Sequence, residues 1–353
     1  MSDLFSPLRI ANLALPNRIL MAALTRARAG RTHIPNALMA EYYAQRAGAG
    51  LIFTEATMVA GDGCAFTGEG GLFNEDCVKG WKLVTDAVHA KGGRIAVQLW
   101  HPGRAAHSSL NNGAQPVSSS DRAISGDTIH TPTGTHTYEV PRKLETDEIA
   151  GYVALFAAAA ERALRAGFDG VQIHAAHGYL IDQFLRDSVN DRTDGYGGSL
   201  AARARFLLEI VDAVAAVTLP EKISVRISPL VPYNDVKDSD PEGLVTYVAQ
   251  QLQVRGIASL ELRHGDHAGP GEQALAEIAR KHFHGILMAN GGYDFASAQT
   301  AIQSGRLDAV VFGKPFISNA NLVERFRSGG ALNPVDFASL YTPGPAGYTD
   351  YPN

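Results

Sequence analysis

Residues 146–174 read TDEIAGYVALFAAAAERALRAGFDGVQIH, and this stretch has the pattern of a helix followed by a buried strand. In the helix-like part, residues 146–166, Thr146 and the acidic residues after it resemble an N-terminal cap, and Gly167 stands where a helix ends. The next run, residues 169–174, is almost continuously apolar, as in a strand that is covered on both faces. Strands of this kind belong to parallel sheets with helices packed on their faces.

The same unit recurs along the chain. Eight short apolar runs predict strands, at residues 19–24, 51–57, 94–99, 169–174, 222–228, 257–262, 285–289 and 308–312. Helix-like stretches follow them, at residues 36–48, 75–91, 146–166, 199–217, 241–255, 271–283, 294–304 and 320–328. Eight alternations favour a closed (β/α)₈ TIM barrel. The alternative is a doubly wound open sheet, but no G-x-G-x-x-G follows the first strand. We therefore predict a single barrel domain over residues 1–353.

Two segments fall outside this alternation. Residues 6–17 (SPLRIANLALPN) predict a short hairpin that plugs the bottom of the barrel before the first strand. Residues 102–145 are rich in Pro, Gly, Ser and Thr and form a long insertion after the third strand. A loop of this length in a compact domain is usually a lid or a binding element. We expect it to stand over the C-terminal face, where barrel active sites lie.

The composition excludes several classes of protein. A net charge of −5 and a pI of about 6.2 give no electrostatic reason to bind nucleic acid or an anionic membrane. The two cysteines, Cys64 and Cys77, cannot form a disulfide framework or a four-thiolate metal site. No secretory signal and no apolar run of ~18 residues is visible. We expect a cytoplasmic protein, either a monomer or a homodimer, without nucleic-acid or membrane partners.

The C-terminal ends of the predicted strands carry a polar ring. Its members are Thr25, Ala56, Gln98, His174 with His177, Arg226, Arg263 with His264, Asn290 with Gly291, and Gly313 with Lys314. This ring contains few carboxylates, which argues against a carboxylate-bound Mg²⁺. It also lacks an evident Schiff-base lysine or carboxylate base, as an isomerase or aldolase on this fold would need.

The loops after the last two predicted strands are rich in glycine. They read ANGGYD at residues 289–294 and FGKPF at residues 312–316. Glycine lets backbone N–H groups approach an anion closely, and Lys314 adds a positive charge. Each loop alone could be only a tight turn; together they favour a phosphate site, which barrels commonly place here.

The histidines His174 and His177 are three residues apart at the fourth strand end. A metal site would need a third ligand, and none is obviously placed to supply it. Both imidazoles can donate a hydrogen bond to a single oxygen, which suits polarising a carbonyl group. On spacing alone both interpretations stay open.

Long motifs resemble the old yellow enzyme family of FMN-dependent ene-reductases, also described as NADPH dehydrogenases and N-ethylmaleimide reductases. The match covers nearly the whole chain and includes LFSPLRIANLALPNRILMAALTRARA at 4–29, AVQLWHPGR at 96–104, AGFDGVQIHAAHGYLIDQFLRDSVNDRTDGYGGSL at 166–200, SVRISP at 224–229, VVFGKPFISN at 310–319 and GYTDYP at 347–352. The resemblance implies non-covalent FMN, with NADPH or NADH as the hydride donor.

The resemblance also implies roles for single residues. Ala23, Thr25, Ala56, Gln98 and Arg226 would contact the flavin ring, and Asn290, Gly291, Gly313 and Lys314 would hold its phosphate. His174 and His177 would bind the oxygen of the substrate, and Tyr179 would protonate its α-carbon. The remaining residues implied as pocket lining are aromatic: Trp100, Phe66, Tyr233 and Tyr341. No residue is implied as a metal ligand.

The activity implied is reduction of activated alkenes, namely α,β-unsaturated carbonyls, maleimides and nitroalkenes. The alternatives are a nitroester or nitroaromatic reductase on the same site, and a non-catalytic flavin redox protein. The chain departs from the family pattern at Ala23, where proline is usual, and at Lys314, where arginine is usual. It also departs at residues 67–73 (TGEGGLF) and 319–322 (NANL).

Overall fold

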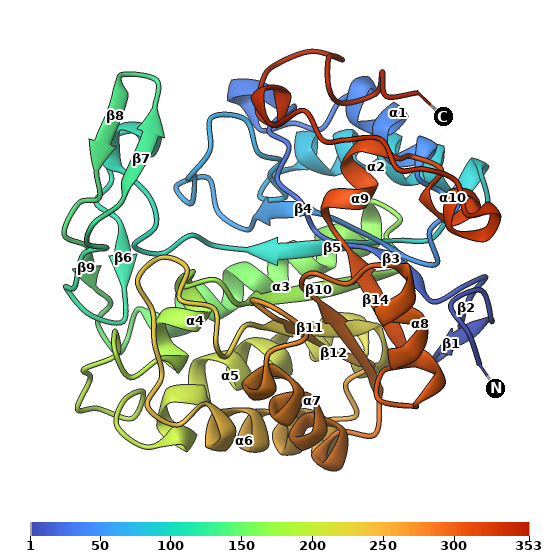
Figure 1. Cartoon of the computed structure of the whole chain (residues 1–353). Coiled ribbons are helices and arrows are strands. Elements are labelled where there is room, and N and C mark those ends of the chain that lie inside the picture. The colour runs from blue at the N-terminus through green and yellow to red at the C-terminus, as the bar shows by residue number, and fades with distance from the viewer. Residues whose placement is uncertain (1, 353) are drawn as a thin grey trace.

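The computed structural model describes residues 2–352, and its centre is a closed barrel of eight parallel strands (Figure 1). The strands are β3 (Ile19–Met21), β4 (Ile52–Met58), β5 (Ile95–Trp100), β10 (Gly170–Ala175), β11 (Ile223–Ile227), β12 (Ser259–Arg263), β13 (Ile286–Asn290) and β14 (Ala309–Phe312). The barrel closes where β14 pairs with β3, with Val310 opposite Ile19. All eight predicted strands and the predicted fold class are confirmed.

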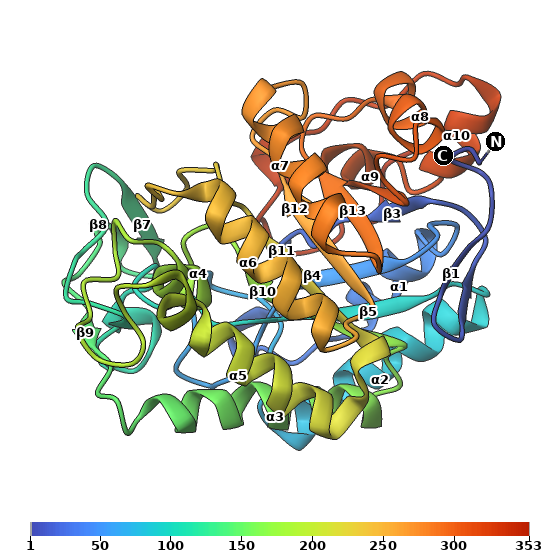
Figure 2. The same ribbon diagram turned by 90° about the horizontal axis from the view of Figure 1, so that it is seen from below.

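Helices surround the barrel, as Figure 2 shows from below. They are α1 (Ala37–Gln45), α2 (Glu75–Ala90), α3 (Ile149–Arg165), α5 (Leu200–Thr218), α6 (Pro241–Val254), α7 (Pro270–His282), α8 (Phe295–Gln303) and α10 (Leu322–Ser328). These are the eight predicted helices. Two further short helices were not predicted, α4 (Leu180–Leu185) and α9 (Lys314–Ser318).

The predicted cap of α3 is wrong. The helix begins at Ile149, three residues after Thr146, and Glu148 in the N-cap position makes no side-chain capping bond. The hydroxyl of Thr146 donates instead to Asp194 Oδ2, at 2.5 Å, so this residue fastens two loops together. The other end follows the prediction, because Gly167 follows the helix with a φ of +90°, a conformation that favours glycine.

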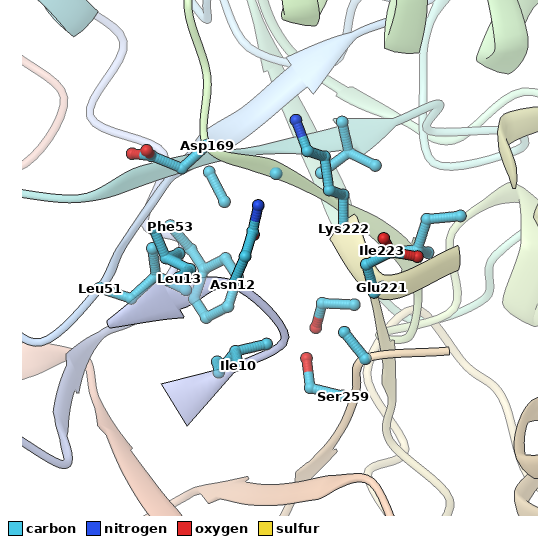
Figure 3. Close-up of a pocket in the computed structure, with 15 residues that line it drawn as sticks. Ile10, Asn12, Leu13, Leu51, Phe53, Asp169, Glu221, Lys222, Ile223 and Ser259 are labelled. Atoms are coloured by element: carbon cyan, nitrogen blue, oxygen red, sulfur yellow. The ribbon is translucent and has the colours of Figure 1, made fainter. Parts of the chain in front are cut away.

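The predicted N-terminal hairpin is present as β1 (Leu8–Ile10) and β2 (Leu13–Leu15). Its apolar side chains pack with Leu20, Phe53 and Met288 inside the lower end of the barrel. A cavity of about 30 Å³ remains there, between Ile10 and Leu13 of the hairpin and the strand starts at Ile223 and Ser259 (Figure 3). This volume holds a water molecule but no substrate.

The insertion after β5 contains four short strands and a 3₁₀ turn, η2 (Ser108–Leu110). Strands β6 (Val117–Ser118) and β9 (Arg142–Lys143) pair with each other, and β7 (Thr128–Thr131) and β8 (Gly134–Thr137) form a hairpin. In Figure 1 these strands lie beyond the end toward which the β5 arrow points. The insertion therefore stands at the C-terminal face of the barrel, as predicted. In residues 2–352 no helix is both long and apolar enough to cross a membrane.

Candidate active site

A cavity of about 720 Å³ opens at the C-terminal ends of the barrel strands. Its size lies in the range of small-molecule sites. The predicted residues that line it are Ala23, Thr25, Ala56, Phe66, Gln98, His174, His177, Tyr179, Arg226, Tyr233, Asn290, Gly291, Gly313, Lys314 and Tyr341. One end of the barrel thus collects residues that are more than 300 positions apart in the sequence.

Trp100 is the exception among the predicted residues. It is the last residue of β5, it is fully buried, and it does not line the cavity. Its ring lies behind the wall, 5.1 Å from the ring of Tyr179 and 6.4 Å from that of Phe66, measured between centroids. The structure therefore places Trp100 as the support of two lining aromatics.

A buried polar relay lies beneath the cavity. Glu261 Oε2 accepts from Gln172 Nε2 at 2.8 Å, and Gln172 Oε1 accepts from Gln98 Nε2 at 2.7 Å. An ionised carboxylate can only accept, so Glu261 fixes which way both amides face. The carbonyl oxygen of Gln98 is thereby turned away from the relay.

Glu261 also pairs with Arg226, whose Nε lies 3.0 Å from Oε1, as a close ion pair without an aligned hydrogen bond. Arg226 Nη2 donates to Asn290 Oδ1 at 3.1 Å, and Asn290 Nδ2 donates to the carbonyl of Val311 at 2.6 Å. Sequence reasoning missed Gln172 and Glu261 because both stand inside runs that read as buried strands. A long polar side chain within such a run was the available signal, since it needs a buried partner.

The end of the cavity near β11 to β14 is positively charged. Arg226, Arg263 and Lys314 line it, and Arg263 Nη1 is buried without a hydrogen-bond partner in the described part of the chain. Burial lowers the pKa of Arg263, and the neighbouring Arg226 adds to that effect. The N–H groups of Gly291 and Gly313 donate to no backbone or side-chain acceptor among residues 2–352. Spare donors and cations in one place fit the phosphate of a ligand such as FMN.

The two histidines lie on another wall, with ring centroids 5.4 Å apart. His174 Nδ1 accepts the N–H of Ala176 at 3.3 Å, so the proton of the neutral ring is on Nε2. Burial, followed by the charge of Arg226, holds the pKa of both imidazoles well below the usual value of 6.5. Both rings are therefore neutral at pH 7, and each keeps one N–H to donate.

The backbone of His177 is held in an unusual conformation, with a φ of +60°. Its N–H donates to Ser228 Oγ at 2.7 Å, and its carbonyl accepts from Asn234 Nδ2 at 2.8 Å. The next residue, Gly178, has a φ of +69°, and a Cβ there would lie 2.6 Å from the carbonyl oxygen of Tyr233. Only glycine fits between the histidine and Tyr179.

Tyr179 precedes α4 and is 8% exposed. Its ring lies 5.2 Å from that of His174, nearly at right angles. Burial, helped by the nearby hydroxyls of Tyr233 and Tyr138, raises the pKa of Tyr179 well above 10. The phenol therefore keeps its proton at neutral pH and faces the cavity as an acid.

Among residues 2–352, no third His, Cys, Asp or Glu side chain lies close enough to His174 and His177 to complete a metal site. Within residues 2–352, the single group of His, Cys, Asp and Glu side chains that is close enough to hold an ion is His33, Cys64 and Glu69. It includes neither His174 nor His177. The geometry therefore favours the pair as hydrogen-bond donors to one oxygen.

Comparison with known proteins shows the family to which the chain belongs. The NADH:flavin oxidoreductase / NADH oxidase family matches residues 3–333. A probable flavin mononucleotide-dependent alkene reductase of Leishmania infantum is 44% identical, over 99% of this chain and 97% of that protein. The 12-oxophytodienoate reductase 7 of Oryza sativa subsp. japonica is 43% identical, over 99% and 94%.

Solved structures agree. Morphinone reductase in complex with tetrahydroNAD is 44% identical with a TM-score of 0.96, covering 100% of this chain and 98% of that one. The old yellow enzyme homologue from Zymomonas mobilis is 43% identical with a TM-score of 0.96, covering both chains fully. This chain belongs to the old yellow enzyme family. It is an oxidoreductase of that type.

The structure shows the surroundings of two positions at which the chain departs from the usual family pattern, Glu69 and Lys314. Glu69, in the segment TGEGGLF, is fully buried and folds back on its own loop. Its Oε1 accepts the N–H groups of Ala65 at 2.8 Å and Phe66 at 3.1 Å, which holds Phe66 at the cavity. Lys314 lies with its ammonium 5.6 Å from the ring of Phe337, another residue of the cavity wall.

The C-terminal segment 337–348 completes this old yellow enzyme cavity. Of this segment, only Tyr341 was predicted to line the site. Phe337, Leu340 and Tyr341 line the wall. Arg28 fixes the segment, because its guanidinium donates to the carbonyls of Leu340 at 2.6 Å and Ser339 at 2.9 Å. Two parts of the chain far apart in sequence thus form one edge of the site.

Proposed function

We propose that this old yellow enzyme family member is an FMN-dependent ene-reductase. It would take hydride from NADH or NADPH and reduce a C=C bond conjugated to a carbonyl, imide or nitro group. The observation that carries the proposal is the juxtaposition of two neutral imidazoles, His174 and His177, with the protonated phenol of Tyr179 on one cavity wall. The relatives named as alkene and 12-oxophytodienoate reductases support it.

The charged end of the cavity would hold the cofactor. Asn290, Gly291, Gly313 and Lys314 would bind its phosphate. Arg263, a member of the predicted polar ring without an assigned role, would add a donor. Thr25, Gln98 and Arg226 would contact the flavin ring, with Ala23 and Ala56 offering backbone groups. FMN held by these residues would supply the redox chemistry that passes hydride from the nicotinamide to the alkene.

The histidine pair would bind and polarise the substrate. Each neutral ring donates one N–H, and both donors converge on the carbonyl or nitro oxygen, where negative charge develops as the β-carbon accepts hydride. Preorganised donors of this kind contribute about 2.7–4 kcal/mol each in measured oxyanion holes, an upper bound for side-chain donors. Because both rings are already neutral, no proton has to leave them before the substrate binds.

Tyr179 would finish the reaction by protonating the α-carbon. Its raised pKa keeps the phenol protonated until charge develops on the substrate beside it. Aromatic side chains of Phe66, Tyr233 and Tyr341 would surround the apolar part of the substrate, and Trp100 would support Tyr179 from behind.

The proposal predicts that Tyr179→Phe separates the two half-reactions. NADH or NADPH should still bleach the yellow protein under anaerobic conditions, whereas the reoxidation by cyclohexenone should slow by about 10²-fold or more, since general acid catalysis contributes that much. Stopped-flow absorbance with cyclohexenone, N-ethylmaleimide and a nitroalkene measures both steps. Equal loss in both would contradict the assigned role, and a colourless protein that binds no FMN would contradict the proposal itself.

The same variant tests reductive cleavage of nitroesters or nitroaromatics, the second candidate. A nitro group offers two oxygens to the histidine pair and no α-carbon that must be protonated by Tyr179. If nitroester reduction survives in Tyr179→Phe at the wild-type rate while all alkenes fail as substrates of the wild type, the second function replaces the first. A non-catalytic flavin protein would turn over neither class.

A further inference from the structure

A second chamber of about 490 Å³ adjoins the main cavity. The two share Phe66, Tyr179, Tyr233 and Tyr341, so they meet at this aromatic boundary. The remaining walls come from Ala27, the loop 65–67, Ala105 and Asn234, and above all from residues 127–130 and Tyr138 of the insertion. None of the side chains proposed to hold FMN lines it.

The two chambers have opposite electrostatic character. Arg226, Arg263 and Lys314 make the main cavity positive at its far end. The second chamber is lined by no Lys or Arg within residues 2–352, and Asp127 is its carboxylate. Asp127 is exposed at the rim, next to the insertion hairpin. Burial raises the pKa values of Tyr138 and Tyr233, and the charge of Asp127 adds to that effect at both tyrosines.

The inner walls of the chamber suit an apolar body. Ala65, Phe66, Ala105 and Ile129 provide apolar surface, and Thr128 and His130 stand with Asp127 toward the solvent. The His130 ring is already engaged, through Nδ1 and the hydroxyl of Thr135 at 2.8 Å. Asp127 is therefore the formal charge that a ligand in this chamber would meet.

We propose that the second chamber holds the distal part of the alkene substrate and selects its charge. Tyr179 borders both chambers, so an alkene whose α-carbon meets this phenol has room for its further substituents beyond the aromatic boundary. The favoured substrate has an apolar body and ends in a cationic group such as an ammonium, and a carboxylate at the same place is disfavoured. The inference rests on the proposed ene-reductase function and specifies its substrate class.

A series of cyclohexenones with one butyl chain, ending in trimethylammonium, hydroxyl or carboxylate, tests this selection in the holoenzyme. Each kcat/KM is divided by that of unsubstituted cyclohexenone in the same variant. Because Asp127 is exposed, we expect the ammonium tail to exceed the carboxylate tail by about three- to tenfold at low ionic strength, with the ratio falling as salt is added. Asp127→Asn should bring the ratio near one, and Asp127→Lys should invert it.

Calorimetry with the corresponding saturated ketones supplies a readout without turnover, since their Kd values should follow the same order. Asp121→Asn is the matched control, because Asp121 is exposed in the same insertion and lines neither chamber. A tail preference that is absent in the wild type, or that persists in Asp127→Asn, overturns the inference. Failure of the proposed function is distinguishable, because the wild type would then not reduce unsubstituted cyclohexenone either.

Discussion

Glu261 is the residue on which the polar relay beneath the cavity depends. Its carboxylate is fully buried and lies against the buried guanidinium of Arg226. Removing one partner of a buried ion pair leaves the other charge without compensation, at a cost of about 3–5 kcal/mol. Glu261→Gln should therefore lower the free energy of unfolding in urea by about 3 kcal/mol.

The same change should disturb the cofactor site, because a glutamine can donate as well as accept and no longer fixes the amides of Gln172 and Gln98. We expect weaker FMN binding, measured by the flavin fluorescence released on dilution. Glu277→Gln, an exposed carboxylate on α7, serves as the control and should change stability by less than about 0.5 kcal/mol. If Glu261→Gln matched that control in both measurements, the relay would have no fixing role.

Glu55 makes stability depend on pH. It is fully buried behind the segment that follows β3, and burial raises its pKa from 4.5 to about 7. Between these values the folded protein binds more protons than the unfolded chain, so stability falls as pH rises and stays lower above about pH 7. A shift of this size corresponds to about 3 kcal/mol for this group.

Glu55→Gln should flatten the decline in unfolding free energy between about pH 5 and pH 7 in urea titrations. Its amide oxygen can still accept the N–H groups of Arg26 and Ala27, which the carboxylate holds at 3.1 and 3.2 Å. Part of the decline in unfolding free energy with pH should remain in this variant, because burial raises the pKa of Glu69 as well. An unchanged slope in Glu55→Gln, equal to that of the exposed control Glu41→Gln, would contradict this assignment.

At the scale of elements, Arg104 joins the insertion to the loop after β11, close to the histidine pair. Its buried guanidinium donates to the carbonyl of Arg122 in the insertion at 2.8 Å, and to those of Asn234 and Asp235 after β11, each at 2.9 Å. Asn234 and Asp235 both have left-handed backbones, with φ of +58° and +57°. Arg104, near the start of the insertion, thus ties the middle of the insertion to the turn whose Asn234 side chain holds the His177 carbonyl.

Arg104→Met should leave these carbonyls without a donor and let the Asn234 turn relax. Because small displacements of a binding group are costly, kcat/KM for cyclohexenone should fall by about tenfold to a hundredfold in steady-state assays. Arg104→Lys keeps the charge but lacks the planar guanidinium with its several donors, so its kcat/KM should lie between those of Arg104→Met and the wild type. Arg122→Met, an exposed arginine of the same insertion, should behave as wild type; if Arg104→Met does so too, the coupling does not exist.

At the scale of the whole molecule, the barrel was predictable because buried parallel strands are continuous apolar runs, as in residues 169–174. The helix α4 was not, since its six residues are shorter than a periodic pattern and lie inside the motif that carries Tyr179. The depth of Trp100 also escaped prediction, because the sequence does not show whether a strand-end aromatic faces a cavity or the layer behind it. The pairing of Val117 with Arg142 depends on contacts across the insertion, which local pattern does not record.

The cavity wall joins residues 22–26 to residues 337–341, and this has a consequence for synthesis. A ribosome adds residues in order, so a nascent chain that lacks Leu340 leaves the Arg28 guanidinium without one of its carbonyl partners and the site open at one edge. The closing strands β14 and β3 are also separated by most of the chain. A cofactor bound in this cavity would therefore be enclosed only after residues 337–341 have been synthesised.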